Sequence, residues 1–199
     1  MDEELFFRLL FIAIYAIFFG VRIRYRVGSA RREPDRRQEA GSWPIKMLIV
    51  AILGYFVSII LYMLDVPWVT WSRLSMPIWL RWLGAIGAAS SIPLVAWTHR
   101  ALGRQYSAEL AIQRDHVLVT TGPYARTRHP MYTALNMFSF SMAIMTSNLL
   151  VLIFAILVIL PFPWIAKAEE QMLLETFEDY QQYMKRTGRF FPRIRRKSK

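Results

Sequence analysis

The chain has 199 residues, of which 55% are hydrophobic and 20% are charged, and its formal net charge at pH 7 is +11. This length suits one domain, and the apolar content is typical of membrane proteins. The lack of cysteine excludes disulfides, thiolate nucleophiles and cysteine-ligated zinc or iron–sulfur clusters. The histidines, His99, His116 and His129, are too few for a multi-histidine di-iron site; they could in principle hold one zinc ion, but we predict no metal.

Five apolar runs predict an all-α integral membrane bundle of five transmembrane helices, the last two forming a tight hairpin. Each run has about the length needed to cross roughly 30 Å of hydrocarbon. The runs are Leu5 to Val21, Met47 to Leu64, Trp79 to Trp97, Pro130 to Met145 and Asn148 to Ala166. The leader Met1 to Glu4 is acidic, so we expect no cleavable signal peptide in the first run.

The basic residues predict how the bundle is oriented. Loop 22–46 carries eight Lys or Arg and the segment after Ala166 carries nine, whereas loop 65–78 has one, Arg73. The positive-inside rule therefore places loop 22–46, loop 99–129 and the C-terminus in the cytoplasm and the N-terminus outside. We interpret the basic tail as a flank for anionic membrane lipids and predict no nucleic-acid partner.

Several residues within the first three runs have structural explanations. Arg8 can extend to the headgroups, so we interpret it as an anchor. Small residues predict close helix packing in the second and third runs, and tryptophans predict an aromatic belt at the outer interface. The small residues are Gly54, Ser58, Gly84, Gly87, Ala88 and Ser91, and the tryptophans are Trp68, Trp71, Trp79 and Trp82.

The stretch HVLVTTGPYARTRHPMY, from His116 to Tyr132, concentrates the chemistry of the chain. Glycine followed by proline at Gly122 predicts a turn that ends a β-prone run, Val117 to Thr120. Proline is tolerated in the first turn of a helix, so a helix is predicted to begin at Pro130. That start leaves backbone donors near Arg128 and His129, which predicts an anion site.

A second polar group follows the fifth run. After Pro161 the sequence becomes amphipathic and predicts one C-terminal helix, with Leu173, Phe177, Tyr180 and Met184 at helical spacing. Glu169 and Glu170 at its start have a plain explanation, because acids in a first turn are favoured by the helix dipole.

A functional interpretation of the two acids is also open. They lie at the membrane edge on the cytoplasmic side, where carboxylates near hydrocarbon usually need partners. Arg128 and His129 are predicted on the same side, so the two polar groups could meet. We interpret Arg128, Glu169 and Glu170 as the catalytic group.

The ordered motifs resemble the isoprenylcysteine carboxyl methyltransferase family and its phospholipid methyltransferase relatives. The resemblance covers roughly the C-terminal half of the chain. It rests on His116, Leu118, Val119, Gly122, Tyr124, Arg128, His129, Pro130 and Tyr132, then Glu169, Glu170, Phe177, Tyr180 and Tyr183. It implies one membrane methyltransferase domain over residues 1–199, with helices in 1–98 and a cofactor-binding half in 99–199.

The resemblance implies S-adenosylmethionine bound from the cytosol and a lipophilic substrate that arrives from the bilayer. It carries cofactor contacts onto Gln113, His116, Val117, Leu118, Val119, Tyr124, His129, Pro130, Met131, Tyr132 and Glu169. The family's substrate arginine, four residues before the first glutamate of the pair, is replaced by Ile165. Lys167 lies about 200° around the helix from that position, so we expect Arg186 to reach the substrate instead.

The residues are consistent with methyl transfer, because an activated sulfonium and an ionised carboxylate need alignment and exclusion of water rather than a nucleophilic side chain. We predict carboxyl O-methylation of a prenylcysteine-like substrate. N-methylation of a phospholipid amine is the first alternative. An NADPH-dependent sterol reductase-like protein and a non-enzymatic membrane scaffold are the others.

Overall fold

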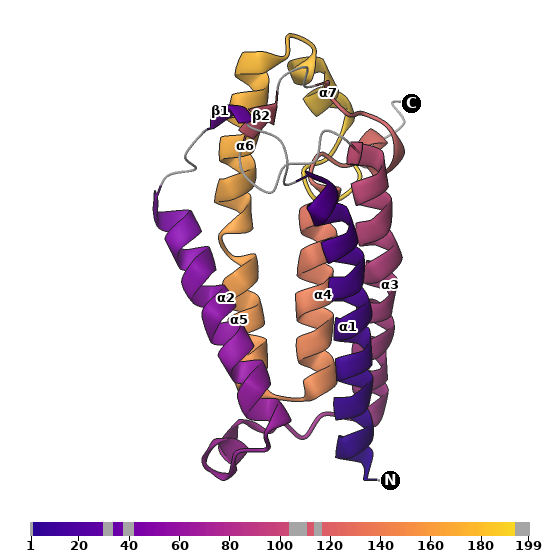
Figure 1. The fold of residues 1–199 in the computed structure, drawn as a ribbon, viewed down its shortest axis with the longest axis vertical. Coiled ribbons are helices and arrows are strands. Elements are labelled where there is room, and N and C mark those ends of the chain that lie inside the picture. The colour runs from indigo at the N-terminus through magenta and orange to yellow at the C-terminus, as the bar shows by residue number, and fades with distance from the viewer. Residues whose placement is uncertain (1, 30–33, 38–41, 104–110, 114–116, 194–199) are drawn as a thin grey trace, which may run out of the picture.

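A computed structural model describes residues 2–29, 34–37, 42–103, 111–113 and 117–193. The described chain is a helical bundle with seven α-helices (Figure 1). They are α1 (Glu3–Ser29), α2 (Ser42–Met63), α3 (Ile78–Leu102), α4 (Pro130–Thr146), α5 (Leu149–Ile159), α6 (Phe162–Thr176) and α7 (Tyr180–Arg186). Two 3₁₀ helices, η1 (Pro67–Ser72) and η3 (Gly122–Ala125), lie in connections between them.

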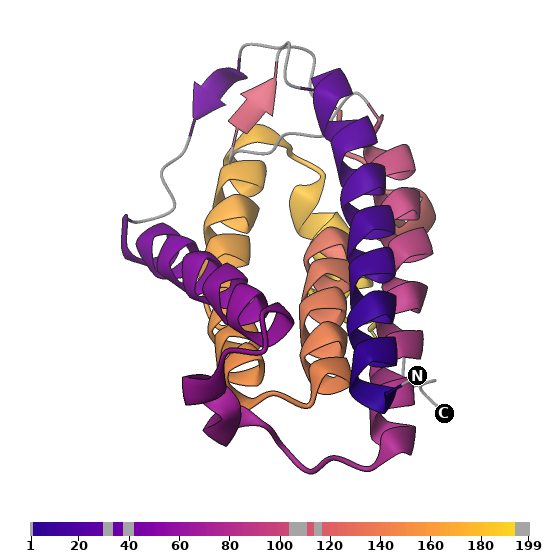
Figure 2. The ribbon, with the colours of Figure 1, turned by 60° about the horizontal axis from the view of Figure 1, so that its bottom comes forward.

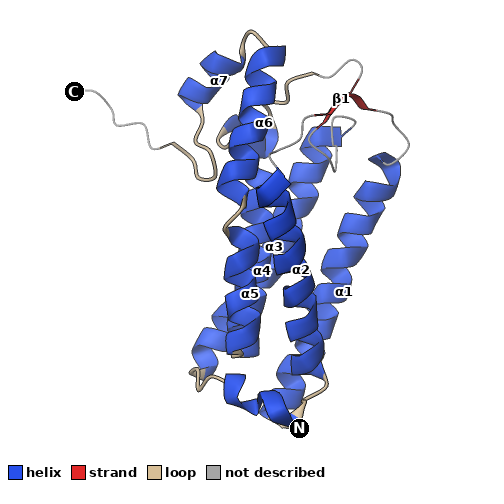
Figure 3. Ribbon diagram, turned by 90° about the vertical axis from the view of Figure 1, so that its left-hand side faces the viewer, coloured by secondary structure: helices blue, strands red, loops and turns tan. Residues whose placement is uncertain are grey.

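The helices pack in two groups. Helix α4 packs most extensively against α3, and α1 lies against both, while α2 pairs with α5. The hairpin between α4 and α5 joins the two groups, as Figure 2 shows. Helices α6 and α7 lie together at the end of the bundle opposite the N-terminus (Figure 3). We call this the site end, and the end that holds the N-terminus and η1 the distal end.

The prediction of an integral membrane helical bundle is confirmed, but the count of five spans is not. Within the described residues, four helical segments are long and apolar enough to cross a membrane: Glu3–Tyr25, Trp43–Met63, Ile78–Leu102 and Leu149–Thr176. The predicted fourth span forms α4, which has 17 residues. At 1.5 Å per residue it extends about 26 Å, less than the roughly 30 Å of hydrocarbon. Membrane orientation and the single-domain boundaries remain predictions.

The predicted close packing of small residues occurs between α3 and α4. A Cβ added at Gly84 would lie 2.7 Å from both the backbone nitrogen of Met145 and the carbonyl oxygen of Ser141. A real side chain there would push the two helix backbones apart. Ala88 and Ser91, on the same side of α3, are fully buried. This contact fixes α4, and therefore the loop that precedes it.

The distal end differs from the prediction for Arg8. The Arg8 guanidinium is mostly buried and pairs with Asp65, with Nη2 2.8 Å from Oδ1. It therefore joins α1 to the segment after α2, rather than only extending to headgroups. The four tryptophans of the predicted belt are exposed, in agreement with that interpretation, with Trp68 the most exposed at 73%.

Two short strands were not predicted. β1 (Pro34–Arg37) pairs antiparallel with β2 (Ala111–Gln113), which links the loop after α1 to the loop after α3. The β-prone run Val117 to Thr120 is not a strand, because it has no ladder partner in the described chain. A β-prone composition does not make a strand without a neighbour to receive its hydrogen bonds.

The single predicted C-terminal helix is also wrong. Helix α6 ends at Thr176, Phe177 is extended, and α7 begins three residues later. The apolar pattern continues across this break because both helices bury one side. Glu169 and Glu170 lie in the middle of α6, not in its first turn. The helix-dipole explanation for the two acids is therefore wrong.

Candidate functional site

The first half of the site is the turn that leads into α4. Gly122 has φ +60°, a conformation that favours glycine, and an added Cβ would lie 3.3 Å from Nε1 of Trp97 on α3. Pro123 follows in the first turn of η3. Helix α4 begins at Pro130, with His129 as its N-cap residue. The predicted turn and the predicted helix start are both confirmed.

The predicted anion site does not form at the backbone of Arg128 and His129. The Arg128 N–H donates to the carbonyl of Gly188 at 2.8 Å, and the His129 N–H donates to the carbonyl of Arg189 at 3.0 Å. In return, the Gly188 N–H donates to Arg126. These two backbone donors are thus used to hold the segment that follows α7.

The second half of the site is the acidic pair on α6, and its meeting with the first half is confirmed. Glu170 is 3% exposed and is the centre of an ion cluster. Its Oε1 accepts from Arg128 Nε at 2.8 Å and lies 3.1 Å from His129 Nε2. Its Oε2 accepts from Arg189 Nη2 at 2.6 Å. A buried carboxylate needs such partners, so Glu170 serves first as a structural counter-ion.

Glu169 has a different environment. Its side chain is 30% exposed, tenfold more than that of Glu170. Its Oε2 accepts from the Tyr132 hydroxyl at 2.8 Å and lies 3.3 Å from His129 Nδ1. The His129 and Tyr132 rings stack, with centroids 5.3 Å apart and planes within 1°. Glu169 is therefore held in position while part of its surface remains available to a ligand.

His129 connects the two glutamates through its two ring nitrogens. Burial alone would lower the pKa of His129, but the facing carboxylates of Glu169 and Glu170 outweigh burial and raise it above its usual value. When protonated, the ring donates to both acids. Hydrogen bonds to Glu170 likewise raise the pKa of Arg189, so that guanidinium stays charged.

Arg128 is a clamp as well as a partner of Glu170. Its Nη1 donates to the carbonyls of Thr187 at 2.7 Å and Met184 at 3.3 Å, at the end of α7. The Tyr183 hydroxyl donates to the carbonyl of Tyr124 at 2.7 Å, which fixes α7 on η3. The catalytic role predicted for Arg128 remains a prediction, because its contacts are structural.

The other predicted site residues fall into three groups. Tyr124, Pro130 and Met131 are buried beside the turn, and Met131 Sδ accepts from Thr98 at 3.4 Å. Val117 is exposed, and Leu118 and Val119 are half-buried, and this run has no ladder partner in the described chain. Gln113 lies in β2, but its side chain and the whole of His116 lie outside the described residues.

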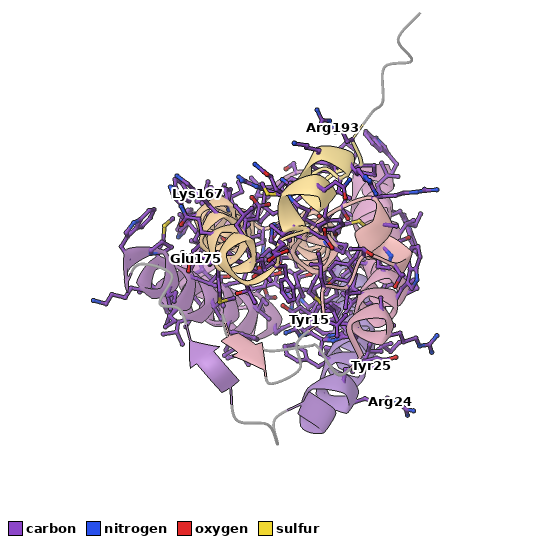
Figure 4. All side chains as sticks on the ribbon, turned by 90° about the horizontal axis from the view of Figure 1, so that it is seen from above. Tyr15, Arg24, Tyr25, Lys167, Glu175 and Arg193 are labelled. Carbon is purple, nitrogen blue, oxygen red and sulfur yellow. The ribbon has the colours of Figure 1, made fainter. Side chains whose placement is uncertain are left out.

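The predicted substrate residue is Arg186, and Ile165 occupies the position of the family's substrate arginine. Ile165 is buried at 7%, and Arg186 is exposed in the last turn of α7. Lys167 is exposed at the periphery, whereas Tyr15 lies inside the bundle (Figure 4). Besides Arg128, the arginine that contacts Glu170 is Arg189, which sequence reasoning missed. The only available signal was its place in a basic, aromatic segment, GRFFPR.

A family model described as phospholipid methyltransferase matches residues 79–180, which is just over half of the chain. The chain belongs to the phospholipid methyltransferase family. The match begins in α3 and includes both halves of the site up to the start of α7, so the predicted resemblance is confirmed.

Two curated relatives are similar to this chain over part of their length. The nickel-cobalt-cadmium resistance protein NccN of Alcaligenes xylosoxydans xylosoxydans is 30% identical over 115 residues, 57% of this chain and 53% of that protein. The cobalt-zinc-cadmium resistance protein CzcN of Cupriavidus metallidurans is 32% identical over 83 residues, which are 41% of this chain and 38% of that protein. The chain thus spans about half or less of the curated relatives that it matches.

A solved structure shares the fold of this family member. It is the eukaryotic intramembrane Ras methyltransferase, isoprenylcysteine carboxyl methyltransferase, with a TM-score of 0.54 and 23% identity. The similarity covers 77% of this chain and 54% of that protein. At this identity the comparison concerns the fold alone.

Proposed function

We propose that this protein is an S-adenosylmethionine-dependent methyltransferase that acts on a lipophilic acceptor at the cytoplasmic end of its helix bundle. The observation that carries the proposal is the meeting of His129 and Tyr132 on one side with Glu169 on the other. The family assignment supports methyl transfer over the reductase and scaffold alternatives.

The donor set fits this cofactor. S-adenosylmethionine supplies a methyl group already activated by a sulfonium, together with an ammonium and ribose hydroxyls. Glu169, half-exposed and fixed by Tyr132, offers a carboxylate oxygen that accepts hydrogen bonds from groups of that kind. The aromatic ring of Tyr132 offers an apolar contact beside it. We assign these residues to the cofactor and no metal to the site.

The chain's own contribution to the reaction is alignment and exclusion of water. Glu170, Arg128 and Arg189 form a rigid ion cluster beneath the ligand-facing carboxylate. Holding donor and acceptor in line and away from water lowers the barrier without a nucleophilic side chain. A carboxylate acceptor with a pKa of about 3.5 is already ionised at pH 7.

The acceptor group has two candidates. The resemblance favours the carboxylate of a prenylcysteine-like lipid, with Arg186 as the predicted cation. The apolar Ile165, buried where the carboxyl methyltransferases have their substrate arginine, favours a phospholipid amine instead. A neutral amine must also lose a proton. Preferred methylation of prenylcysteine or of phosphatidylethanolamine by the purified protein decides between them, and preferred methylation of a soluble acid would contradict the lipophilic acceptor.

The cofactor assignment is tested with Glu169→Gln. This change removes the charge but keeps the shape, so we expect the affinity for S-adenosylmethionine to fall about tenfold or more while the melting temperature changes little. Calorimetric titration and thermal unfolding of the same detergent sample measure both, with NADPH as the control ligand. Unchanged affinity with a collapsed melting temperature would make Glu169 a structural residue. Binding of NADPH alone would support the reductase alternative.

A further inference from the structure

The segment after α7, Gly188 to Phe190, is built into the site although no motif includes it. The backbone carbonyls of Gly188 and Arg189 accept hydrogen bonds from the N–H groups of Arg128 and His129, respectively. The Thr133 hydroxyl donates to the carbonyl of Phe190 at 2.8 Å. The Phe190 ring lies 5.9 Å from the His129 ring, centroid to centroid. This segment therefore lies beside the residues that we assign to the cofactor.

Arg189 reaches from this segment to α6 and binds Glu170 with two nitrogens. Nη2 donates to Oε2 at 2.6 Å and Nε donates to Oε1 at 3.1 Å. Two hydrogen bonds from one guanidinium fix the orientation of the carboxylate and also balance its charge. Arg128, in contrast, places one nitrogen on Glu170 and another on the carbonyls at the end of α7. Oε2 of Glu170 is therefore fixed by Arg189.

The pairing of Arg189 with Glu170 also affects His129, which contacts the same carboxylate. The imidazole lies between the two glutamates, 3.1 Å from Glu170 Oε1 and 3.3 Å from Glu169 Oε2. Arg189 neutralises Glu170, which weakens the attraction of that carboxylate for the ring. The ring can then be shared with Glu169. Without Arg189, the ring would be drawn to Glu170 and its contact with Glu169 would weaken.

We propose that Arg189 is a positioning residue of the cofactor site, which acts through Glu170 and His129 to hold Glu169 toward the ligand. This inference rests on the proposed function, because it concerns the same cofactor. It assigns a role in the site to a residue outside every recognised motif.

The inference is tested on the full chain in detergent with Arg189→Ala and Arg189→Lys. The control is Arg193→Ala, which removes an exposed arginine four residues after Arg189 that donates to the Lys185 carbonyl. We expect Arg189→Ala to weaken S-adenosylmethionine binding about tenfold, the size of effect typical of losing one hydrogen bond to a charged group. Lysine should restore part of the affinity, because it keeps the charge but not the two-point geometry. Arg193→Ala should bind like the unchanged protein.

A second measurement separates positioning from a merely structural role. The carboxylates that face the His129 ring are those of Glu169 and Glu170 on α6, and the uncharged rings of Tyr132 and Phe190 lie beside it. Glu170 is also paired with two guanidinium groups, those of Arg128 and Arg189, and Arg128 remains in the Arg189 variants. Removing the positive charge of Arg189 should raise the pKa of His129 further. Histidine imidazole signals in NMR, assigned through His129→Gln, measure this pKa.

Two results would overturn the inference. One is an unchanged affinity in Arg189→Ala; the other is a His129 pKa that falls toward the free value of about 6.5, which would mean that the site has come apart. If the unchanged protein does not bind S-adenosylmethionine, the proposed function fails on its own. The direction of the His129 pKa change in Arg189→Ala then still decides whether Arg189 positions the ring.

Discussion

Both ends of the bundle hold a buried cluster of arginine and carboxylate, but the two clusters are built in opposite ways. At the distal end the buried group is a cation: the Arg81 side chain is 7% exposed, and its acidic partners Glu3 and Glu4 are 56% and 33% exposed. At the site end the buried group is an anion, Glu170, surrounded by cations. The distal arginine joins helices, with its Nε on the Met145 carbonyl and its guanidinium 3.9 Å from the Phe7 ring centroid.

The difference shows which feature marks a candidate site. A buried ion pair is not enough, since the distal end has one that serves to join α1, α3 and α4. The site end adds a second carboxylate, Glu169, that is held by a tyrosine and a histidine and yet partly exposed. Because the Glu169 carboxylate is held in place and is also partly exposed, a ligand can reach it.

The largest effect is expected from Glu170→Ala. This change leaves Arg128, Arg189 and His129 without their shared counter-ion, and breaking a buried ion pair in this way costs about 3–5 kcal/mol. Unfolding monitored by heat or denaturant should show the loss, and cofactor binding should fall with it. A melting temperature equal to that of the unchanged protein would refute the counter-ion role.

A smaller effect is expected at the distal end from Arg81→Ala. The acids there are exposed and can be solvated, so the loss comes mainly from the Met145 carbonyl and the contact with Phe7, about 1–3 kcal/mol. The affinity for S-adenosylmethionine should stay the same, because the change lies at the far end of the bundle from Glu169. A clear fall in affinity would mean that the two ends are coupled.

The smallest effect is a pH dependence confined to the site end. The pKa of His129 is raised in the folded protein, so its stabilising contribution is fully present below the unfolded value of about 6.5 and is lost as pH rises through the folded pKa. Melting temperatures across this range should fall for the unchanged protein and for Arg81→Ala. The same fall in His129→Gln would assign the effect to another group.

Much of the site could be predicted because local rules act there. Proline and glycine fixed the turn at Gly122 and the helix start at Pro130, and charge distribution placed both polar groups on one side. Ordered motifs then connected Arg128 and His129 with the acids of α6. This meeting could be predicted from the direction in which each helix runs, without knowing how the helices pack.

The remaining features depended on contacts between distant segments. The break after Thr176 was not predicted because apolar residues continue at helical spacing through it. The backbone donors of Arg128 and His129 were expected to be available, since their partners, Gly188 and Arg189, lie about sixty residues away and carry no motif. The predicted fourth span has nearly the same bounds as α4, so the error lay in taking a run of that length as enough to cross the hydrocarbon.

The hydrogen bonds between the turn before α4 and the segment after α7 have a consequence for biosynthesis. Gly188 follows Arg128 by 188 − 128 = 60 residues. At roughly 5–20 residues per second, the ribosome needs about 3–12 s to make that interval. During this time α4 and the span Leu149–Thr176 can already be synthesised, while Arg128 and His129 lack their backbone partners. Membrane insertion and completion of the site are therefore separate events, and a cofactor can bind only after the second.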